Sequence, residues 1–183
     1  MSTTPSFRHY DPERDEAVLY DLLCNEPWPH RVKAVMTADD VRHELELGIY
    51  TNADVLTYLI AVGDDVAGYV RSDDLGHERT DPQLDFRLRE RFRGHGIGPV
   101  ALEFITREIF DRYPQTNRIE GQTRRDNVAM RKVFVRGGYA MEGVYRQAWP
   151  GQDRQYDGIG YAMLRGDWES GTTTPVDFSE ADA

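Results

Sequence analysis

The chain has 183 residues, 39% of them hydrophobic and 30% charged, and its formal net charge is −10. This length and composition suit a single domain with a buried core, and the acidic balance argues against binding to nucleic acid. No apolar run approaches the ~18 residues of a membrane span, and the start of the chain lacks a signal-peptide pattern, so we expect a cytoplasmic protein that does not bind membranes. The single cysteine, Cys24, excludes an internal disulfide.

Helix-capping signals alternate with helix breakers in the first part of the chain. Asp11 before Pro12 is typical of a helix N-terminus, and Thr37 opens a second helical segment. Two closely spaced prolines, Pro27 and Pro29, exclude regular structure between the two helices. The predicted elements are a strand at 7–10, a helix from 12 to about 25, a loop at 26–30 and a helix from 37 to about 48.

The rest of the chain reads as strands interrupted by two further helices. The segment Gly63-Asp64-Asp65 predicts a hairpin turn, and the alternation of apolar and polar residues at 84–88 predicts a half-buried strand. The predicted strands lie at 55–62, 66–70, 84–88, 118–123, 139–147 and 156–164, the helices at 98–113 and 127–136, and a turn at 149–152.

This order of elements predicts a layered α/β (α+β) domain with a mixed sheet and helices on its faces. We expect one domain over residues 1–168. The end of the chain, residues 169–183, is rich in small and acidic residues and is predicted to be a disordered tail.

The most informative segment is the glycine-rich turn Arg93-Gly94-His95-Gly96-Ile97-Gly98, between a predicted strand and a predicted helix. Backbone amides of such a turn can converge on an anion at the helix N-terminus, where the helix dipole also favours negative charge. Pro99 is expected at the first helical position, where its missing N–H costs nothing. The turn therefore predicts a binding site for a phosphate-bearing ligand.

Two basic segments in the acidic chain support this prediction. Residues 86–98 carry four arginines against one glutamate, a net +3, and residues 122–136 carry four arginines and one lysine against one aspartate, a net +4. Such clustering suits a polyanionic ligand, although any single one of these residues is better explained as part of a solvated surface.

Two common phosphate-binding patterns fit the turn poorly. The chain has no Gly-x-x-x-x-Gly-Lys-Ser/Thr run, so nucleotide hydrolysis of that type is not expected. A nicotinamide dinucleotide remains an alternative, because Glu120 lies at about the distance of a ribose-binding acid. The spacing is Gly-x-Gly-x-Gly instead of Gly-x-Gly-x-x-Gly, however, and the preceding strand is the fourth in the chain.

The sequence resembles the GNAT superfamily of acetyl-coenzyme A-dependent N-acetyltransferases over residues 6–168. Residues 93–98 match the family's Arg/Gln-x-x-Gly-x-Gly/Ala signature, and Asn127 with Gly138-Tyr139 matches a second motif about thirty residues later. The segments at 123–131 and 142–148 resemble the RimJ/RimL branch, which acetylates the N-termini of ribosomal proteins.

The resemblance implies a GNAT fold, a mixed, mostly antiparallel sheet of about seven strands with helices on both faces, and acetyl-coenzyme A as the cofactor without a metal. The strand before the turn would pair with the pantetheine arm, the turn amides would hold the pyrophosphate, and the fourth and fifth strands would splay apart. The implied cofactor-binding residues are Leu88, Arg89, Glu90, Arg93, Gly94, His95, Gly96, Ile97, Gly98, Asn127 and Arg131.

For catalysis, the resemblance makes the Leu88 N–H the donor to the oxyanion, a fixed dipole aimed at developing charge. Asp85 and Glu120 are the candidate general bases on the predicted strands, with ordinary ion pairing as the alternative for each. The family's usual acid positions are occupied by Phe134 and Met130, which have no proton to donate. A module that binds acyl-coenzyme A with little or no catalysis is therefore the alternative function.

The predicted acceptor is a primary amine, either a small cationic amine or a protein N-terminus, attacking directly in a ternary complex. By resemblance it would approach over the loop at 26–37 and the last hairpin, and a homodimer is possible. The candidate acceptor contacts are Trp28, Trp149, Tyr156 and Asp157, with core packing as the alternative for both tryptophans.

Overall fold

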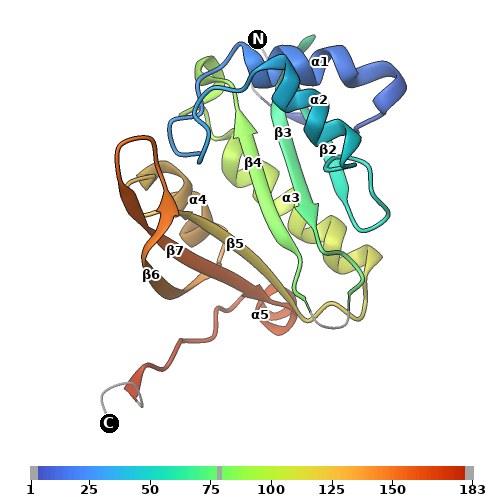
Figure 1. Cartoon of the computed structure of the whole chain (residues 1–183). Helices are drawn as coiled ribbons and strands as arrows, with labels where there is room; N and C mark the ends of the chain where they lie inside the picture. The colour runs from blue at the N-terminus through green and yellow to red at the C-terminus, as the bar shows by residue number, and fades with distance from the viewer. Residues whose placement is uncertain (1–3, 78–79, 180–183) are drawn as a thin grey trace.

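A computed structural model describes residues 4–77 and 80–179. Within these residues, seven strands form one sheet in the order β1-β2-β3-β4-β5-β7-β6, with helices on both faces (Figure 1). In chain order the elements are β1 (Ser6–His9), α1 (Pro12–Cys24), α2 (Ala38–Glu46), β2 (Leu56–Val62), β3 (Asp65–Asp73), β4 (Gln83–Leu88), the 3-10 helix η1 (Glu90–Phe92), α3 (Ile97–Arg112), β5 (Arg118–Arg124), α4 (Val128–Arg136), β6 (Ala140–Pro150), β7 (Gln155–Leu164) and α5 (Arg165–Ser170). The predicted fold class is confirmed.

The sheet is antiparallel except at its centre, where β4 and β5 run parallel. These two strands share only one paired position, Gln83 with Glu120, and the Glu120 N–H donates to Pro82 O at 2.8 Å. From that closed end the strands diverge, as Figure 1 shows. The central strands therefore leave backbone groups unpaired in the middle of the sheet, where a ligand can supply partners.

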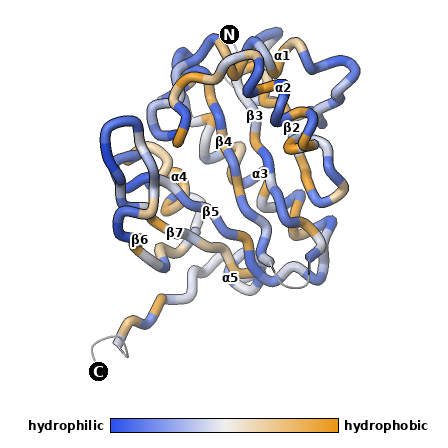
Figure 2. Tube along the Cα trace, in the orientation of Figure 1, coloured by the Kyte–Doolittle hydropathy of each residue, from blue (hydrophilic) through white to orange (hydrophobic). Residues whose placement is uncertain are grey.

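Each face of the sheet has its own hydrophobic core. On one face, α3 and α4 pack on Ile60, Val70 and their neighbours, and on the other α1 and α2 pack on Leu59 and Tyr69. Because strand side chains alternate between faces, the position of Phe86 in the α3–α4 core places Asp85 and Arg87 on the α1–α2 face. Figure 2 shows hydrophobic residues along the central strands, whereas the connection between β6 and β7 is hydrophilic.

Local sequence signals account for where the helices begin. Asp11 caps α1 by accepting a hydrogen bond from the Glu13 N–H, and Thr37 forms a reciprocal capping box with Asp40 at α2. Asn127 caps α4 by accepting from the Met130 N–H. Among the helices of the described residues, none has the length and apolar character needed to cross a bilayer.

Three sequence-based expectations need correction. Pro99 is the third residue of α3, which begins at Ile97; the first N–H groups of a helix have no intrahelical partner, so proline is tolerated there too. Trp149 and Pro150 belong to β6, because they pair with Tyr156 and Gln155 of β7 beyond a register shift.

The third correction concerns the end of the chain. Residues 165–170 form α5, where the Trp168 ring lies 5.1 Å from the Phe110 ring, so regular structure continues past the predicted boundary at 168. The Thr173 hydroxyl donates to Gly138 O at 2.8 Å and the Thr174 hydroxyl contacts Asp167, which ties the segment after α5 to the domain. The final part of the predicted tail, residues 180–183, lies outside the described residues.

Candidate active site

A cavity of about 380 Å³ opens where β4 and β5 diverge, and we call it the splay cavity. Its walls come from four segments, at residues 28–31, 86–88, 93–99 and 127–136. Apolar groups such as Phe86, Leu88 and Met130 line it, together with the cations Lys132 and Arg136. A long ligand with an apolar arm and anionic groups is the kind of molecule that such a lining suits.

The edge of β4 offers backbone groups to this cavity. The Arg89 N–H donates to Ala67 O of β3, and in an antiparallel pair every second residue points its N–H and C=O away from the partner strand. The amides of Phe86 and Leu88 therefore face the divergence. Arg31 donates to Phe86 O at 3.0 Å and Arg93 to Leu88 O at 2.8 Å, so two arginine side chains meet carbonyls of this edge.

The glycine turn places three glycines, Gly94, Gly96 and Gly98, in the cavity wall. Gly94 and Gly96 each have φ of +80°, which L-residues rarely adopt, and nothing lies within 4 Å of where their Cβ atoms would be. Gly96 is the N-cap of α3 and has no side chain to satisfy the first helical amides. Those amides and the helix dipole remain available for an anion.

The other predicted residues of this turn have different surroundings. Ile97 is buried in the core between α3 and the sheet, and the exposed His95 does not line the splay cavity. Arg93 does line it, donates to Pro27 O at 3.3 Å and lies over the Trp28 ring, which ties the loop at 26–30 to the end of β4.

Of the two predicted residues at α4, the N-cap Asn127 lines the cavity and Arg131 does not. Arg131 points away from it, with Nε 3.4 Å from the Tyr161 hydroxyl and Nη1 donating to Arg125 O. Lys132 and Arg136 line the cavity together with Ala129 and Val133, a 3–4 residue spacing that marks one side of a helix. The spacing alone does not say which side of α4 faces the cavity, because Asn127 and Arg131 are related by the same interval.

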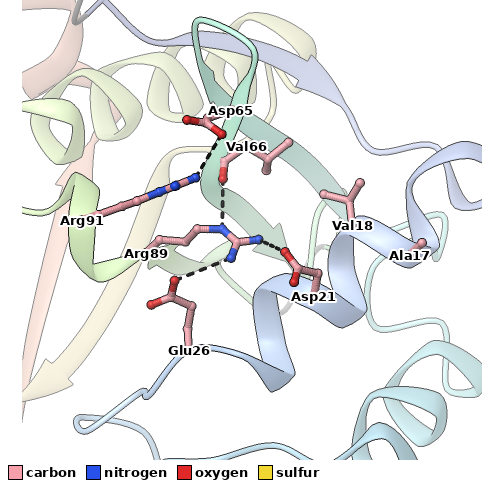
Figure 3. A pocket seen from close by; sticks show the side chains of 8 residues that line it. All are labelled: Ala17, Val18, Asp21, Glu26, Asp65, Val66, Arg89 and Arg91. Atoms are coloured by element: carbon pink, nitrogen blue, oxygen red, sulfur yellow. Dashed lines mark hydrogen bonds and ion pairs between the residues drawn. The ribbon is translucent and has the colours of Figure 1, made fainter.

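Arg89 and Glu90 also lie outside the splay cavity. β4 ends at Leu88, and Glu90 begins η1, where its N–H donates to Glu26 at 3.3 Å. The Arg89 side chain turns toward α1, pairs with Asp21 and Glu26, and donates to Val66 O at 3.1 Å (Figure 3).

Asp85 lies beneath the loop at 26–37, on the α1–α2 face. It is 9% exposed, pairs with Arg31, and accepts a hydrogen bond from the Tyr69 hydroxyl at 2.8 Å. Burial lowers the pKa of Arg31 to about 10, with the charges of Arg87 and Arg71 contributing, so Arg31 still carries its charge at neutral pH. Asp85 is thus held in an ion pair at the inner end of the site.

Glu120 lies at the closed end of the divergence and does not line the splay cavity. It accepts hydrogen bonds from Gln83 at 2.6 Å and from Arg118. Burial works to raise the pKa of Glu120, but these hydrogen bonds and the charge of Arg118 outweigh it and hold the pKa below its usual value. The surroundings of Glu120 are those of an ion pair, the alternative that the sequence left open.

His30 is a cavity residue that the sequence reasoning missed. It lines the splay cavity, its Nδ1 is buried without a hydrogen-bond partner, and Asp126 lies 3.7 Å away. Burial lowers the pKa of His30, and the charges of Arg124 and Arg93 act in the same direction against Asp126. The neutral imidazole is the form that can accept a proton, and it predominates at neutral pH.

A second cavity of about 310 Å³, which we call the rim cavity, is formed by residues 31–36, α2 residues, Arg87 and Trp149. It therefore joins the loop and the last hairpin, the two segments predicted to receive the acceptor. Arg31 and Arg87 line both cavities, so the two cavities lie next to each other.

The four predicted acceptor contacts fall into different places. Trp149 lines the rim cavity, and Trp28 lines the splay cavity with Nε1 donating to Leu23 O at 3.3 Å. Tyr156 stacks under Arg124, whose Cζ lies 3.6 Å from the ring centre, and Asp157 accepts hydrogen bonds from Gln147 N and Arg125. Tyr156 and Asp157 line neither cavity.

This combination of a splayed central sheet, a glycine turn and an apolar cavity with a cationic end is the architecture of an acyl-coenzyme A-dependent transferase. A family model described as "Acetyltransferase (GNAT) domain" matches residues 6–140, and the chain belongs to this family. Membership of this family makes the protein an acetyltransferase that uses acetyl-coenzyme A. No curated protein matches the chain by sequence.

Several solved structures share the fold. The ribosomal L7/L12 alpha-N-protein acetyltransferase RimL, in complex with coenzyme A, matches with a TM-score of 0.76 and 23% identity over 89% of this chain and 95% of that one. Spermidine N-acetyltransferase from Vibrio cholerae, in complex with coenzyme A and spermine, matches with a TM-score of 0.76 and 12% identity over 92% of this chain and 99% of that one. RimJ from Mycobacterium smegmatis, in complex with a coenzyme A disulfide, matches with a TM-score of 0.71 and 19% identity over 89% of this chain and 83% of that one.

Proposed function

We propose that the protein transfers an acetyl group from acetyl-coenzyme A to a primary amine by direct attack in a ternary complex. The observation that carries the proposal is that two neighbouring cavities share Arg31 and Arg87, one beside the glycine turn and one bordered by Trp149 of the last hairpin. Two ligands can thereby meet without a covalent enzyme intermediate. Solved relatives named for acetylating a protein N-terminus and spermidine support an amine as the acceptor.

The residues of the splay cavity fit acetyl-coenzyme A. Gly94 and Gly96 present a backbone with no side chain in the way, and the first amides of α3 are uncapped. Lys132 and Arg136 supply positive charge on the same cavity, and the edge of β4 that faces the divergence can donate its N–H groups to an extended amide-containing arm. The fit depends on groups from the turn, α4 and β4, which lie together only in the folded chain.

When bound, acetyl-coenzyme A supplies a thioester carbonyl that the amine nitrogen attacks, so that a C–N bond forms, the C–S bond breaks, the amine loses a proton and the thiolate gains one. The Leu88 N–H, which faces the divergence, is the proposed donor to the oxyanion. His30 is the proposed base that receives the amine proton, directly or through water, because it lines the cavity as a neutral imidazole. We assign Asp85 to holding Arg31 in position.

We assign no side chain as the acid for the leaving thiolate. Met130 lines the cavity without a proton to donate, and Phe134 is buried against Tyr161, with ring centres 4.9 Å apart. Protonation of the thiolate by water is consistent with this arrangement and predicts modest turnover.

The proposal is tested by thermal-shift titration with acetyl-coenzyme A, coenzyme A, NADH and ATP in parallel, followed by thiol release over a panel of primary amines. A ligand at 100 times its dissociation constant stabilises the folded state by about 2.7 kcal/mol. We expect shifts with the two coenzyme A ligands and thiol release with at least one amine. Tight binding without release from any amine would favour the alternative of an acyl-coenzyme A-binding module.

A further inference from the structure

Arg87 is a buried cation at the centre of the site. Its side chain is 8% exposed and lies between two aromatic rings, with Cζ 5.4 Å from the Trp28 centre and 5.8 Å from the Tyr69 centre. Nη1 contacts Met36 Sδ at 3.1 Å, and Nε is buried with no hydrogen-bond partner. The guanidinium is therefore held in place by packing while part of its donor capacity stays unused.

The neighbouring carboxylates are already engaged with other arginines. Asp85 pairs with Arg31, and Arg71 pairs with Asp73 at 2.9 Å and lies 3.9 Å from Asp85. No ion pair between described residues involves Arg87. Three guanidiniums thus share two carboxylates in this cluster, and Arg87 is the one that has no carboxylate in ion-pair contact.

Such a charge is costly in a folded protein. Arginine cannot lose its proton at physiological pH, and a buried charge without a partner disfavours folding. The aromatic faces of Trp28 and Tyr69 recover only part of that cost. A residue kept in this state is suited to bind an anion that arrives with a ligand, and planar guanidinium groups match carboxylates with two parallel hydrogen bonds.

The rim cavity shows which ligand this anion belongs to. Arg87 lines it with the cations Arg31 and Lys33 and with the carboxylates Asp40 and Glu44. Asp40 pairs with Lys33, whereas Glu44 accepts a hydrogen bond from the neutral Tyr50 hydroxyl and forms no ion pair with Arg87. The glycine turn and α4 do not reach this cavity. An anion at Arg87 on this side belongs to the acceptor and is separate from the phosphate groups expected at the turn.

We propose that Arg87 binds a carboxylate of the acceptor, so that the preferred substrate is a primary amine that also carries a carboxylate a few bonds away. This inference rests on the proposed function and replaces the expectation of a small cationic amine, which the positive charge of Arg87 would repel. The carboxylate belongs either to a free amino acid or to an acidic residue at the start of a peptide, and the two sources share the same chemistry.

The first experiment compares matched acceptors in the wild-type protein. We expect β-alanine to be acetylated with a kcat/KM about 10- to 100-fold higher than β-alaninamide, the value of a charge-assisted hydrogen bond pair. If kcat/KM is higher by the same factor for a C-terminally amidated Asp-Ala-Gly peptide than for Asn-Ala-Gly, the carboxylate is that of an acidic residue at a peptide N-terminus. Spermidine should be the poorest acceptor.

The second experiment uses Arg87→Met, Arg87→Lys and the control Arg91→Met, an exposed arginine outside both cavities that pairs with Asp65. Arg87→Met should abolish the preference for the carboxylate while acetyl-coenzyme A still raises the unfolding temperature. Arg87→Lys should retain part of the preference for the carboxylate, and Arg91→Met should retain all of that preference. Because the charge is unpaired, Arg87→Met alone should unfold at the wild-type temperature or above.

A binding measurement keeps this inference separate from the proposed function. With coenzyme A present and ionic strength matched, succinate should raise the unfolding temperature of the wild-type protein, and succinamide should not. The Arg87→Met variant should not respond to succinate. Equal rates with β-alanine and β-alaninamide, or an equal succinate shift in wild type and Arg87→Met, would overturn the inference even if acetyl transfer is observed.

Discussion

The ring of Phe134 lies directly against Gly121 of β5. A Cβ atom on Gly121 would fall 2.3 Å from Cζ of Phe134, a separation that real contacts do not allow. The ring also stacks on Tyr161 at 4.9 Å with planes 15° apart, and is 1% exposed. One of the two positions that the resemblance assigns to the acid is therefore filled here by a core side chain that requires glycine opposite it.

This contact predicts that Phe134→Tyr will not restore a general acid. The new hydroxyl would be attached to Cζ, the atom that already packs against Gly121 in a fully buried site, so the change should destabilise the fold by about 1–3 kcal/mol through overpacking. Urea denaturation measures this, with Phe92→Tyr on a half-buried ring as the control. A stable Phe134→Tyr variant with faster turnover would contradict this account of the site.

Contiguous signals explain why so much of the fold could be predicted. The caps at Asp11, Thr37 and Asn127 act on amides two or three residues away, and the glycine turn carries its backbone requirement within six residues. Such interactions involve residues that are close in the sequence, so they can be recognised without knowing how distant segments pack.

The parts of the site that were missed depend on contacts between distant segments. The loop at 26–37 covers β4 in the folded chain. This packing lowers the pKa of His30 and buries Arg87 away from solvent. Neither burial nor the sharing of carboxylates can be read from sequence neighbours. The faces of β4 were likewise undetermined until the packing of Phe86 placed Asp85 opposite it.

Asn127 is predicted to have two separable roles. Its Oδ1 caps α4 and its Nδ2 donates to Thr123 at 3.1 Å, so Asn127→Ala should cost about 1 kcal/mol of stability and weaken binding of coenzyme A. Asn127→Asp keeps the capping oxygen and loses the donor. If the role is only capping, the aspartate variant will titrate with coenzyme A like the wild type in a calorimeter, which would remove Asn127 from the cofactor site.

Gly96 is predicted to be required by its conformation. A φ of +80° strains any L-residue, and the new side chain of Gly96→Val would stand beside the uncapped amides of α3, so coenzyme A binding should fall at least tenfold. Gly166→Ala, in α5, also has open space at its Cβ but lacks the positive φ, and should bind normally. Equal affinity in both variants would argue against the turn as the phosphate site.

His30 is predicted to set the acidic limb of the pH–rate profile. Its pKa lies below the usual value of about 6.5, so kcat/KM should rise with pH through that lowered pKa and then level off. His30→Gln should lower the rate by about 10²-fold or more and remove this limb.

The same shift has a consequence for stability. Because the folded state holds the proton less tightly than the unfolded state, the contribution of His30 to stability is present above pH ~6.5 and declines as the pH falls below it. Measuring unfolding of wild type and His30→Gln at several pH values checks this sign. An unchanged acidic limb in the variant's rate profile would mean that water or another group takes the proton.

Asp85 and Glu120 are predicted to respond differently to loss of their charge. Asp85→Asn leaves Arg31 without its partner in a cluster that already holds a guanidinium with no carboxylate in ion-pair contact, so the free energy of unfolding should fall by about 2–4 kcal/mol, somewhat less than for a fully buried pair. Glu120→Gln breaks a half-buried ion pair with Arg118 and should cost about 1 kcal/mol or less.

The double variant Arg31→Met with Asp85→Asn separates positioning from catalysis. Removing both partners of a buried pair restores most of the stability lost when one is removed, so the double variant should be more stable than Asp85→Asn alone. If Asp85 acts by holding Arg31, both variants will keep the acidic limb that depends on His30, with a raised KM for the acceptor. A stable Asp85→Asn protein that has lost that limb would identify Asp85, and not His30, as the base.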